Sequence, residues 1–454
     1  MEAPLRTSSY LIPVKLESEP DKYMLIHGYT GAIDIATEGL LKKIQSIASG
    51  TDLLPEMVDI LLKRGYITTK TQEEEYAYVE RMATALYRKA EILNTSFTWV
   101  ITYNCNFRCP YCFEGRNTKD GQKQIVFTEE TVNRAYQVME QIQPHKELRR
   151  NMITLFGGEP LLAENKEILT YIVEEGVKRG YKFSAVTNGY DLDAYLDLLS
   201  PEKICKLQVT IDGMRELHNA RRVHYKYHNT FDKIIANLRL GLEKGVVVSV
   251  RMNVDNRNMN DFLQLKHYFE SNGFYHYPDF RFYSAYLRNN TSIDESEQEC
   301  LDFLSKKDYL EKNKQQGTLS VCQNHGVLQM IHNAIENRKP ISFRPTFCGA
   351  QVGSYVIDPI GRIYPCWEVI GKDEYQIASY DQKEVHWNKT ILSEWRKSKI
   401  LNKTACHTCR YALICGGGCL YHSQSGNKGH CYYFQKMFDF IVNNALVQKA
   451  KAIV

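Results

Sequence analysis

Apolar runs and amphipathic stretches alternate regularly from residue 96 to about residue 285. The apolar runs, rich in β-branched and aromatic residues, predict strands at Phe97–Tyr103, Met152–Phe156, Lys182–Thr187, Lys206–Ile211, Val246–Val254 and Phe280–Ser284. The stretches between them predict helices that include Thr128–Gln141, Lys166–Lys178, Thr230–Lys244 and Asn260–Ser271. Six strand–helix units in sequence predict an α/β fold with a parallel sheet. Six units rather than eight indicate a partial (β/α)6 barrel, with its chemistry beyond the carboxyl ends of the strands.

The first 94 residues follow a different pattern. Two predicted strands, Tyr10–Leu16 and Lys22–Ile26, flank a polar turn, and two amphipathic helices follow near Thr37–Ile47 and Leu54–Lys63. A short strand is predicted at Tyr66–Thr69. Strands, two helices and a further strand in so short a segment fit a small winged helix-turn-helix. Residues 73–93 then form one charged helix that connects this segment to the predicted barrel.

Composition and charge exclude several classes of protein. A hydrophobic fraction of 43% and a charged fraction of 24% are those of a folded globular protein. A net charge of +4 is too small to indicate a nucleic-acid partner. No apolar run approaches the ~18 residues of a membrane helix, and the N-terminus lacks the regions of a signal peptide. We therefore expect a cytoplasmic protein with neither a membrane nor a nucleic-acid partner.

The cysteines are distributed unevenly along the chain. Of thirteen cysteines, none precedes Cys105, three lie between Cys105 and Cys112, and seven lie between Cys348 and Cys431. Where thiols stay reduced, cysteines in such groups are metal ligands more often than disulfide partners. The distribution predicts a cysteine-free front region, a central domain that begins with one metal site, and a cysteine-rich rear region.

The first group, Cys105, Cys109 and Cys112, follows the first predicted barrel strand. Three thiolates in one tight loop can each bind one iron of a cubane, which leaves the fourth iron open to a ligand. A zinc site or buried structural thiols are the alternatives, and a CxxC pair alone would favour zinc. The spacing of three and then two residues is more specific than such a pair.

This spacing matches in full the CxxxCxΦC signature of the radical S-adenosylmethionine (SAM) superfamily, with Tyr111 at the aromatic position. The resemblance implies a [4Fe–4S] cluster whose open iron binds SAM through its amino and carboxylate groups. It also implies reductive cleavage of SAM to a 5′-deoxyadenosyl radical. Gly157, Gly158 and Glu159 follow the second strand and resemble the GGE motif, in which the glycines allow close backbone approach and the glutamate accepts the SAM ammonium.

Polar residues at the ends of later strands resemble further SAM contacts of the superfamily. Thr187 and Asn188 end the third strand, and Thr210 and Asp212 end the fourth. Arg222 stands where related enzymes have an arginine that pairs with the SAM carboxylate, a role that suits a planar guanidinium. On the fifth strand, Arg251 and Asn253 share one face and could line the same pocket.

The rear cysteines are similar to those of the SPASM domain, which carries two auxiliary [4Fe–4S] clusters. By position, this resemblance gives one cluster to Cys348, Cys366 and Cys419 and the other to Cys406, Cys409, Cys415 and Cys431. The first set needs a fourth ligand, either Cys322, with Cys300 as a weaker candidate, or the thiolate of a substrate. Two zinc ribbons are the alternative. With the barrel cluster, the resemblance implies three [4Fe–4S] clusters in all. Cys205 is interpreted as a buried core thiol.

The front region resembles the RiPP recognition element, a winged helix-turn-helix that binds the leader of a precursor peptide as an added strand. The alternative is a DNA-binding winged helix, but the second helix, LPEMVDILLKRG, lacks the polar residues of base recognition. The whole layout, including the stretch from His27 to Ala36, resembles the ranthipeptide maturases. It implies a thioether cross-link between a Cys sulfur and a carbon of another residue, with Asp one candidate. It also implies an external electron donor such as flavodoxin or ferredoxin.

Other functions remain open at this point. Radical SAM alternatives are a sactipeptide α-thioether, a carbon–carbon cross-link or a sulfatase-type oxidation of Cys or Ser, and a zinc-binding scaffold is a rival from another class. The predicted boundaries are a leader-binding domain at 1–94, the barrel at 95–290, a bridge at 291–345, the SPASM domain at 346–435 and a C-terminal helix at 436–454.

Overall fold

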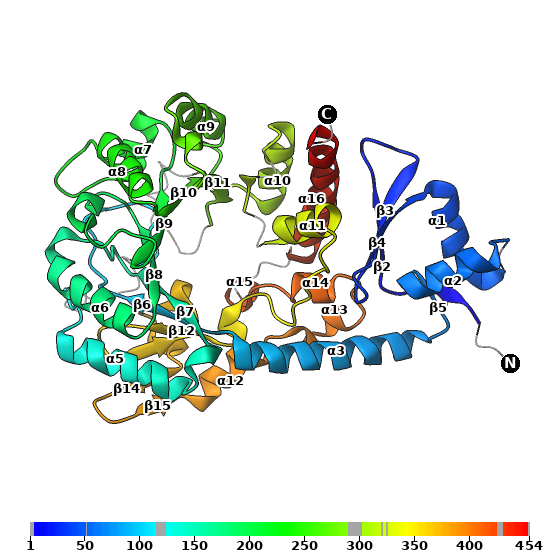
Figure 1. The fold of residues 1–454 in the computed structure, drawn as a ribbon, viewed down its shortest axis with the longest axis horizontal. Coiled ribbons are helices and arrows are strands. Elements are labelled where there is room, and N and C mark those ends of the chain that lie inside the picture. The colour runs from blue at the N-terminus through cyan, green and yellow to red at the C-terminus, as the bar shows by residue number, and fades with distance from the viewer. Residues whose placement is uncertain are drawn as a thin grey trace.

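A ten-stranded sheet runs through the larger part of the molecule (Figure 1). In this computed structural model, the structure describes residues 4–50, 52–114, 124–288, 302–318, 321–323, 326–424 and 430–452. The strand order is β11-β10-β9-β8-β7-β6-β12-β13-β14-β15. Its first six strands in the chain are β6 (Thr95–Val100), β7 (Arg149–Phe156), β8 (Lys182–Thr187), β9 (Ile204–Thr210), β10 (Val247–Val254) and β11 (Phe280–Tyr286).

These six strands are parallel and lie side by side in chain order, as a partial barrel requires. Both ends of each strand lie within three residues of the ends predicted from the sequence. The helices between them are α5 (Glu129–Ile142), α6 (Lys166–Lys178), α7 (Arg215–Arg221), α8 (Phe231–Glu243) and α9 (Asp261–Ser271). Their buried apolar faces belong to the same core as alternate strand residues that share one side of the sheet, such as Phe183 and Ala185 of β8. The predicted α/β fold and partial barrel are confirmed.

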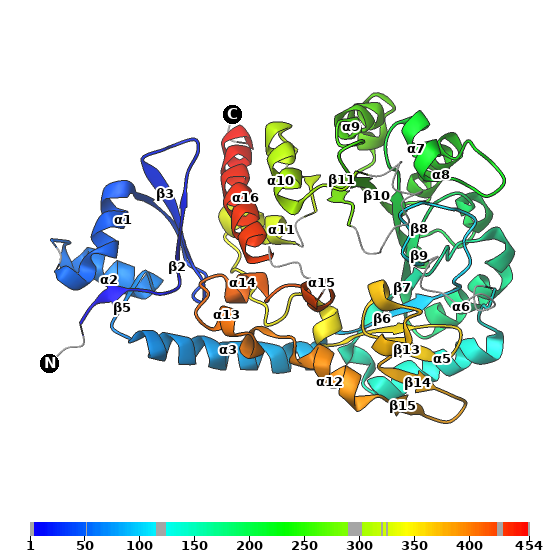
Figure 2. The same cartoon turned by 180° about the vertical axis from the view of Figure 1, so that it is seen from behind.

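The sheet continues from β6 into the rear region, which the sequence did not indicate. Strand β12 (Ser354–Ile357) pairs in parallel with β6, and β13 (Arg362–Tyr364), β14 (Ala378–Tyr380) and β15 (Val385–Trp387) then add in antiparallel fashion. Figure 2 shows these strands beside β6. The buried Tyr103 hydroxyl donates to Asp358 Oδ2 at 2.8 Å and so joins the end of β6 to the β12–β13 turn. The barrel and the rear region therefore share one core.

The N-terminal region contains a strand that the prediction missed. Strands β2 (Leu11–Lys15), β3 (Lys22–His27) and β4 (Ile33–Thr37) form an antiparallel sheet with β4 at its edge, and β1 (Arg6–Thr7) pairs with β5 (Ile67–Thr68). Helix α1 (Glu38–Gln45) begins only after β4, and α2 (Pro55–Arg64) follows. The Thr37 side chain accepts from the Leu40 amide as the N-cap of α1, so Thr37 ends the strand and starts the helix.

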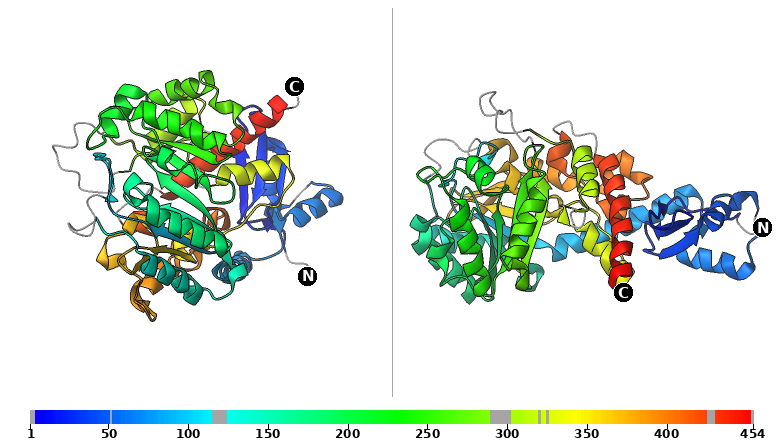
Figure 3. Two further views of the ribbon diagram at one scale, coloured as in Figure 1. Left: turned by 60° about the vertical axis from the view of Figure 1, so that its left-hand side comes forward. Right: turned by 90° about the horizontal axis from the view of Figure 1, so that it is seen from above.

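Helix α3 (Gln72–Leu93) joins the N-terminal domain to the rest of the molecule (Figures 1 and 3). It begins with a capping box, in which Thr71 accepts from the Glu74 amide and Glu74 accepts from the Thr71 amide. Three glutamates in its first turn interact favourably with the positive end of the helix dipole. The helix runs along the rear region and ends directly before β6.

A helical subdomain packs against the N-terminal sheet. It consists of α10 (Lys306–Gln315), α11 (Val327–Glu336) and α16 (His430–Ala452), whose apolar side chains share a core with β2 and β3. Helix α16 begins at His430, so the domain boundary predicted after residue 435 falls inside it. Four short helices lie nearby in the chain: α12 (Lys389–Lys397), α13 (Thr404–His407), α14 (Ala412–Cys415) and α15 (Leu420–Gln424). Of the last five cysteines, Cys406 lies in α13, Cys415 in α14 and Cys431 in α16, and Cys409 and Cys419 lie between helices. Within the described ranges, no helix is long and apolar enough to cross a membrane.

Candidate active site

The three cysteines of the first group lie in the loop that follows β6. The Cys105 sulfur accepts from the Phe107 amide at 3.3 Å, and the Cys112 amide donates to the Cys109 carbonyl at 3.1 Å. Burial raises the pKa of the Cys109 thiol to about 12, against the opposing effect of Arg222. Burial and the nearby Glu159 and Cys109 hold the pKa of Cys105 well above its ordinary value. Thiols buried together in this way favour a bound metal, which would take them as thiolates.

Gly157 and Gly158 let the end of β7 lie directly on this cysteine loop. A Cβ at Gly157 would stand 2.2 Å from the Thr102 carbonyl oxygen, and one at Gly158 would stand 2.3 Å from that of Asn104. The backbone hydrogen bonds from Gly158 to Thr102 and from Glu159 to Asn104 depend on this approach. The glycines were predicted to admit a ligand, and the structure shows that they pack against the cysteine loop itself.

Glu159 is buried at the centre of a hydrogen-bond network. Its carboxylate accepts from the Leu161 amide at 2.9 Å, from the Thr187 hydroxyl at 2.6 Å and from the Asn188 amide at 2.6 Å. Burial raises the pKa of Glu159 to about 7 despite these three donors. Because an ionised carboxylate has about four acceptor positions, one remains for a cationic ligand. Thr187 thus orients Glu159.

Asn188 connects the same network to the cysteine loop. Its side-chain amide donates to the Asn106 side chain at 2.7 Å, and Asn106 donates in turn to Asp191 at 3.1 Å. Asn106 is buried and lies between Cys105 and Cys109. Sequence reasoning missed Asn106 and Asp191, although the position of Asn106 between two predicted ligands was a usable signal.

Tyr111, Asp212 and Arg222 form a second network on the other side of the cysteine loop. The Tyr111 hydroxyl donates to Asp212, and Arg222 Nη1 donates to the Tyr111 oxygen at 3.1 Å. The segment after Arg222 pairs with the cysteine loop through the hydrogen bond from the Arg108 amide to the Val223 carbonyl, at 2.7 Å. Arg222 Nε is buried without a hydrogen-bond partner in the described structure, so this guanidinium retains capacity for an anion.

Arg221 is a residue that sequence reasoning overlooked beside Arg222. It is buried in an ion pair with Asp255 at 2.9 Å, and its guanidinium lies 5.5 Å from the centre of the Tyr111 ring. The two adjacent arginines therefore approach Tyr111 together. The doublet in the sequence was a signal for a second cationic residue.

The other predicted barrel residues lie on the neighbouring strands β9 and β10. Thr210 of β9 is buried and pairs in register with Arg251 of β10. The Asn253 amide donates to Asp212 Oδ1 at 3.0 Å. Against the opposing effect of burial, His422 and Arg288 hold the pKa of Glu368 below its ordinary value, and Arg251 also contributes. Arg251 of the barrel is therefore close enough to Glu368 of the rear region to affect its ionisation.

Cys348, Cys366 and Cys419 come together in the rear region. Burial and the other two thiols raise the pKa of Cys366 well above its ordinary value, and burial and Cys419 raise that of Cys348 to about 11. Glu368 lies beside them, paired with Arg288 at 2.9 Å and with His422 at 2.7 Å. A cavity of about 640 Å³ between α3 and β12 reaches Cys348. Sequence reasoning did not include Glu368, although it stands two residues after Cys366.

Cys406, Cys409, Cys415 and Cys431 form a separate group. Burial and the neighbouring Cys409 raise the pKa of Cys406 to about 11, and Cys431 also contributes. Burial raises the pKa of Cys415 to about 12, with Cys406 and Cys409 contributing. The rear cysteines thus divide in space into the same three and four that the resemblance suggested.

Cys322 and Cys205 lie outside these three groups of cysteines. Burial raises the pKa of Cys322 to about 12, and this thiol lies near the hydroxyl groups of Tyr309 and Tyr433. Cys205 is half-buried rather than buried, and its thiol donates to the Phe183 carbonyl at 3.4 Å. Cys300 lies outside the described residues.

The donor sets determine which metal groups fit. No three His, Cys, Asp or Glu side chains among the described residues close around a single ion. The first group has three thiols in mutual electrostatic contact, and the four-cysteine group has four. Soft thiolate sets of three and four fit iron–sulfur clusters by their chemistry. The residues present therefore fit the implied clusters.

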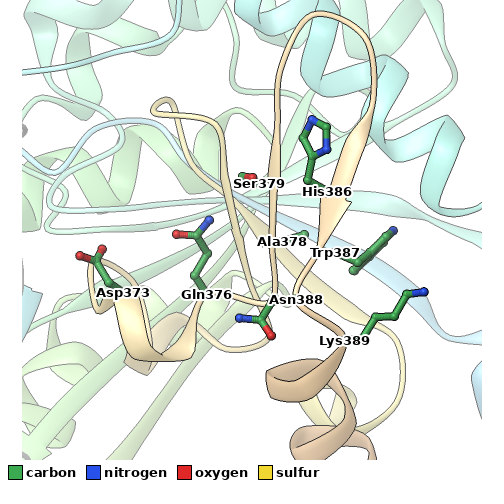
Figure 4. A pocket seen from close by; sticks show the side chains of 8 residues that line it. All are labelled: Asp373, Gln376, Ala378, Ser379, His386, Trp387, Asn388 and Lys389. Atoms are coloured by element: carbon green, nitrogen blue, oxygen red, sulfur yellow. The ribbon is translucent and has the colours of Figure 1, made fainter.

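A pocket of about 620 Å³ lies away from these groups, on the face of β14 and β15 (Figure 4). Its polar lining residues include Asp373, His386, Asn388 and Lys389. These strands are at the opposite edge of the sheet from β11. None of the predicted site residues lines this pocket, and we assign it no chemistry.

Comparison with known proteins identifies the barrel. Residues 99–269 match the model of the Radical SAM superfamily. The chain contains a radical SAM domain. This family implies SAM and one [4Fe–4S] cluster as cofactors. The matched residues include the cysteine loop, Glu159 and Arg222.

Relatives of the radical SAM chain extend beyond this domain. A cysteine-type anaerobic sulfatase-maturating enzyme of Clostridium novyi is 24% identical over 343 residues, which cover 70% of this chain and 85% of that protein. The structure of anSMEcpe with bound AdoMet and the Cp18Cys peptide has a TM-score of 0.55 at 19% identity, covering 79% of this chain and 98% of that one.

A second solved structure also includes the N-terminal region. The structure of SuiB from Streptococcus suis bound to the precursor peptide SuiA has a TM-score of 0.52 at 14% identity. It covers 93% of this chain and 97% of the SuiB chain. The fold of the radical SAM chain is thus similar to that of SuiB over nearly its whole length. The chain therefore combines a radical SAM domain with a fold that resembles anSMEcpe and SuiB.

Proposed function

We propose that this radical SAM enzyme modifies a ribosomally made precursor peptide by joining a Cys sulfur to a carbon of another residue in a thioether. The observation that carries this proposal is the relation between two thiol groups. The barrel loop presents three thiols beside Glu159 and Arg222, and the rear region presents three thiols beside Glu368. Arg251 of the barrel is near Glu368.

The barrel residues are suited to hold SAM beside a cluster bound by Cys105, Cys109 and Cys112. Glu159 has one acceptor position left for the SAM ammonium, and Arg222 has a buried Nε for the SAM carboxylate. Thr187 and Asn188 fix Glu159, while Tyr111 and Asp212 fix Arg222. Bound there, the cluster and SAM would supply a 5′-deoxyadenosyl radical to take one hydrogen atom from a peptide carbon. Closing the thioether on the substrate thiol would then release one proton and one electron, and an auxiliary cluster would accept the electron.

The rear cysteines are suited to two auxiliary [4Fe–4S] clusters, which makes three in the protein. Cys406, Cys409, Cys415 and Cys431 supply the four ligands of one. Cys348, Cys366 and Cys419 supply three ligands of the other. Cys322 lies against Tyr309 and Tyr433 on α10 and α16, which favours a fourth position left for a substrate thiolate over ligation by Cys322. An electron donor such as flavodoxin or ferredoxin would support turnover.

The N-terminal domain supports a peptide substrate. The antiparallel sheet β2-β3-β4 ends in the edge strand β4, whose Ile35 side chain is 52% exposed. An edge strand offers unpaired backbone groups to which an extended leader peptide can add. The SuiB structure, which shares this fold, contains the precursor peptide SuiA.

One experiment tests the proposal directly. The anaerobically reconstituted enzyme is incubated with SAM, dithionite and a cysteine-containing precursor peptide. We expect the peptide to lose two hydrogens per cross-link and to resist alkylation at the joined cysteine. Conversion of a substrate Cys or Ser to an aldehyde would instead support the sulfatase-type oxidation that the Clostridium relative suggests. An unchanged peptide mass would contradict both.

A further inference from the structure

The turn between β3 and β4, residues 27–31 with the sequence HGYTG, faces the four-cysteine group of the rear region. A Cβ at Gly28 would stand 2.2 Å from the carbonyl oxygen of Arg410. Arg410 Nη1 donates to the Leu11 carbonyl of β2 at 2.8 Å. The N-terminal sheet therefore touches the residue directly after Cys409.

Tyr10 makes a second contact with the same loop. Its hydroxyl donates to the carbonyl of His407, between Cys406 and Cys409, at 3.1 Å. Cys406 and Cys409 pack against a small buried cluster that Tyr10 shares with α3 and the rear region. The members of this cluster are Tyr10, Val79, Ala83, Ile400, Ala412 and Leu413. The acceptor at His407 and the donor at Arg410 thus both belong to the loop that holds two predicted metal ligands.

The turn also makes contacts with α3. Tyr29 donates to Glu75 of α3 at 3.1 Å and packs edge-on against Tyr10 with ring centres 5.3 Å apart. The buried Glu75 carboxylate also accepts from Ser8 and from the Ser9 amide. A turn held by α3 on one side and by the cysteine loop on the other has little freedom to move independently of either.

We propose that Tyr10, Gly28 and Arg410 are positioning residues, which hold the N-terminal domain on the Cys406–Cys409 loop so that a bound leader delivers its core peptide to the barrel. The inference rests on the proposed function, because it assigns these residues to delivery of the peptide. Gly28 is required for its size, since any side chain would push the sheet away from the loop. The residues act through the domain that they place and contact neither SAM nor the reacting atoms.

Gly28→Ala tests this with Gly39→Ala as the matched control. Gly39 is exposed at the start of α1, and its Cβ would meet only the Thr37 side chain, at 4.0 Å. Each variant is assayed with the full precursor and with the same core peptide lacking its leader. For Gly28→Ala we expect kcat/KM on the full precursor to fall at least tenfold, with an unchanged rate on the core alone. Affinity for the isolated leader should stay within twofold, and Gly39→Ala should behave as wild type.

Two outcomes would overturn the inference. Gly28→Ala could process the full precursor as fast as wild type does, or it could slow both substrates equally, which would indicate a loss of stability only. Arg410→Ala provides a variant that adds no atoms, and Arg410→Lys should restore part of its loss by keeping a donor near the Leu11 carbonyl.

Hydrogen exchange separates this inference from the proposed function. The Gly28 amide donates to the Tyr10 carbonyl at 2.9 Å at the docked turn. In iron-loaded protein without any peptide, its exchange should be at least fivefold faster in Arg410→Ala than in wild type or Gly39→Ala. If wild type modifies no peptide but this difference appears, the proposed function fails and the docking stands. An unchanged exchange rate would refute the docking, whatever the peptide assays show.

Discussion

At the scale of single residues, Glu159 shows how a polar group is prepared for a cationic ligand. Three donors occupy its carboxylate, and burial raises its pKa to about 7. Substitution Glu159→Gln keeps the size of the side chain but removes the charge. We expect SAM to bind about 10- to 100-fold more weakly, because a hydrogen bond to a charged group contributes about 1.5–3 kcal/mol. Equilibrium dialysis with labelled SAM measures this change.

The control for this variant is Glu164→Gln. Glu164 is exposed, and its side chain accepts a hydrogen bond from Asn104 at 3.1 Å but is not hydrogen-bonded to Glu159. Both variants should retain their iron, as neither changes a thiol. Equal SAM affinity in Glu159→Gln and wild type would show that the ammonium lies elsewhere.

His27 gives a prediction for pH at the same scale. Its Nδ1 accepts from the Thr30 amide at 3.1 Å, and its Nε2 is 2.9 Å from the Ser8 oxygen, which itself donates to Glu75. The neutral ring with a proton on Nε2 satisfies both contacts, and burial lowers the pKa of His27 to about 4. Because the folded pKa lies below the unfolded value of about 6.5, stability is complete above pH 6.5. It should fall by about 3 kcal/mol as the pH drops to about 4.

Hydrogen exchange of the β2 and β3 amides in iron-free protein measures this loss. The variant His27→Gln has no titrating group at this position, so its stability should change less between pH 6.5 and pH 4. A wild-type domain whose exchange protection is independent of pH in this range would contradict the assignment of a neutral, buried imidazole.

At the scale of elements, the approach of β7 to the cysteine loop is the contact most sensitive to a single atom. In Gly158→Ala, the new Cβ would lie 2.3 Å from the Asn104 carbonyl and 2.6 Å from that of Tyr103, and both are backbone atoms that cannot move aside freely. We expect the variant to lose the barrel cluster and measurable SAM binding. Iron and sulfide analysis should show about four fewer irons per chain.

Gly241→Ala is the matched control. Gly241 lies in α8, and its Cβ would stand 3.4 Å from the Leu207 side chain, which is an ordinary van der Waals distance. It should retain all of its iron. Full cluster content in Gly158→Ala would show that the loop can shift without losing its metal.

The strands and helices of the barrel could be predicted because their patterns are local. Helix α6 and strand β8 have the predicted limits, since Lys166–Lys178 has an apolar face and Lys182–Thr187 alternates. Strand β4 was missed because Ile33–Thr37 is short and adjoins α1, so its residues were divided between a loop and a helix. The pairing of β12 with β6 depends on residues about 250 positions apart, which no local pattern encodes.

The candidate site divides in the same way. The barrel thiols were predicted from their spacing, and the rear groups were predicted from their resemblance to the SPASM domain. Asn106, Arg221 and Glu368 were missed because their partners, Asn188, Asp255 and Arg288, are brought to them only by the fold. Buried polar residues of this kind are chosen by tertiary contacts rather than by periodicity.

At the scale of the whole molecule, the sheet and α3 connect the three parts of the enzyme. The pairing of β6 with β12 and the hydrogen bond from Tyr103 to Asp358 join the barrel to the three-cysteine group. Helix α3 and the HGYTG turn join the N-terminal domain to the four-cysteine group. Both rear cysteine groups are therefore adjacent to a junction between parts, so we expect metal binding there and the arrangement of the domains to depend on each other.

The four-cysteine group allows this dependence to be measured. Cys409→Ser removes one of its four thiols, and with three clusters the iron content should fall from about twelve to about eight per chain. Because the barrel site is untouched, dithionite-driven cleavage of SAM should remain within about twofold of wild type. Cross-linking of the full precursor should be lost, since the loop that bears Cys406 and Cys409 also holds Tyr10. Cys205→Ser is the control, as this half-buried thiol of β9 contacts the Phe183 carbonyl instead, and it should retain all twelve irons and full activity. Retention of twelve irons by Cys409→Ser would rule out Cys409 as a ligand.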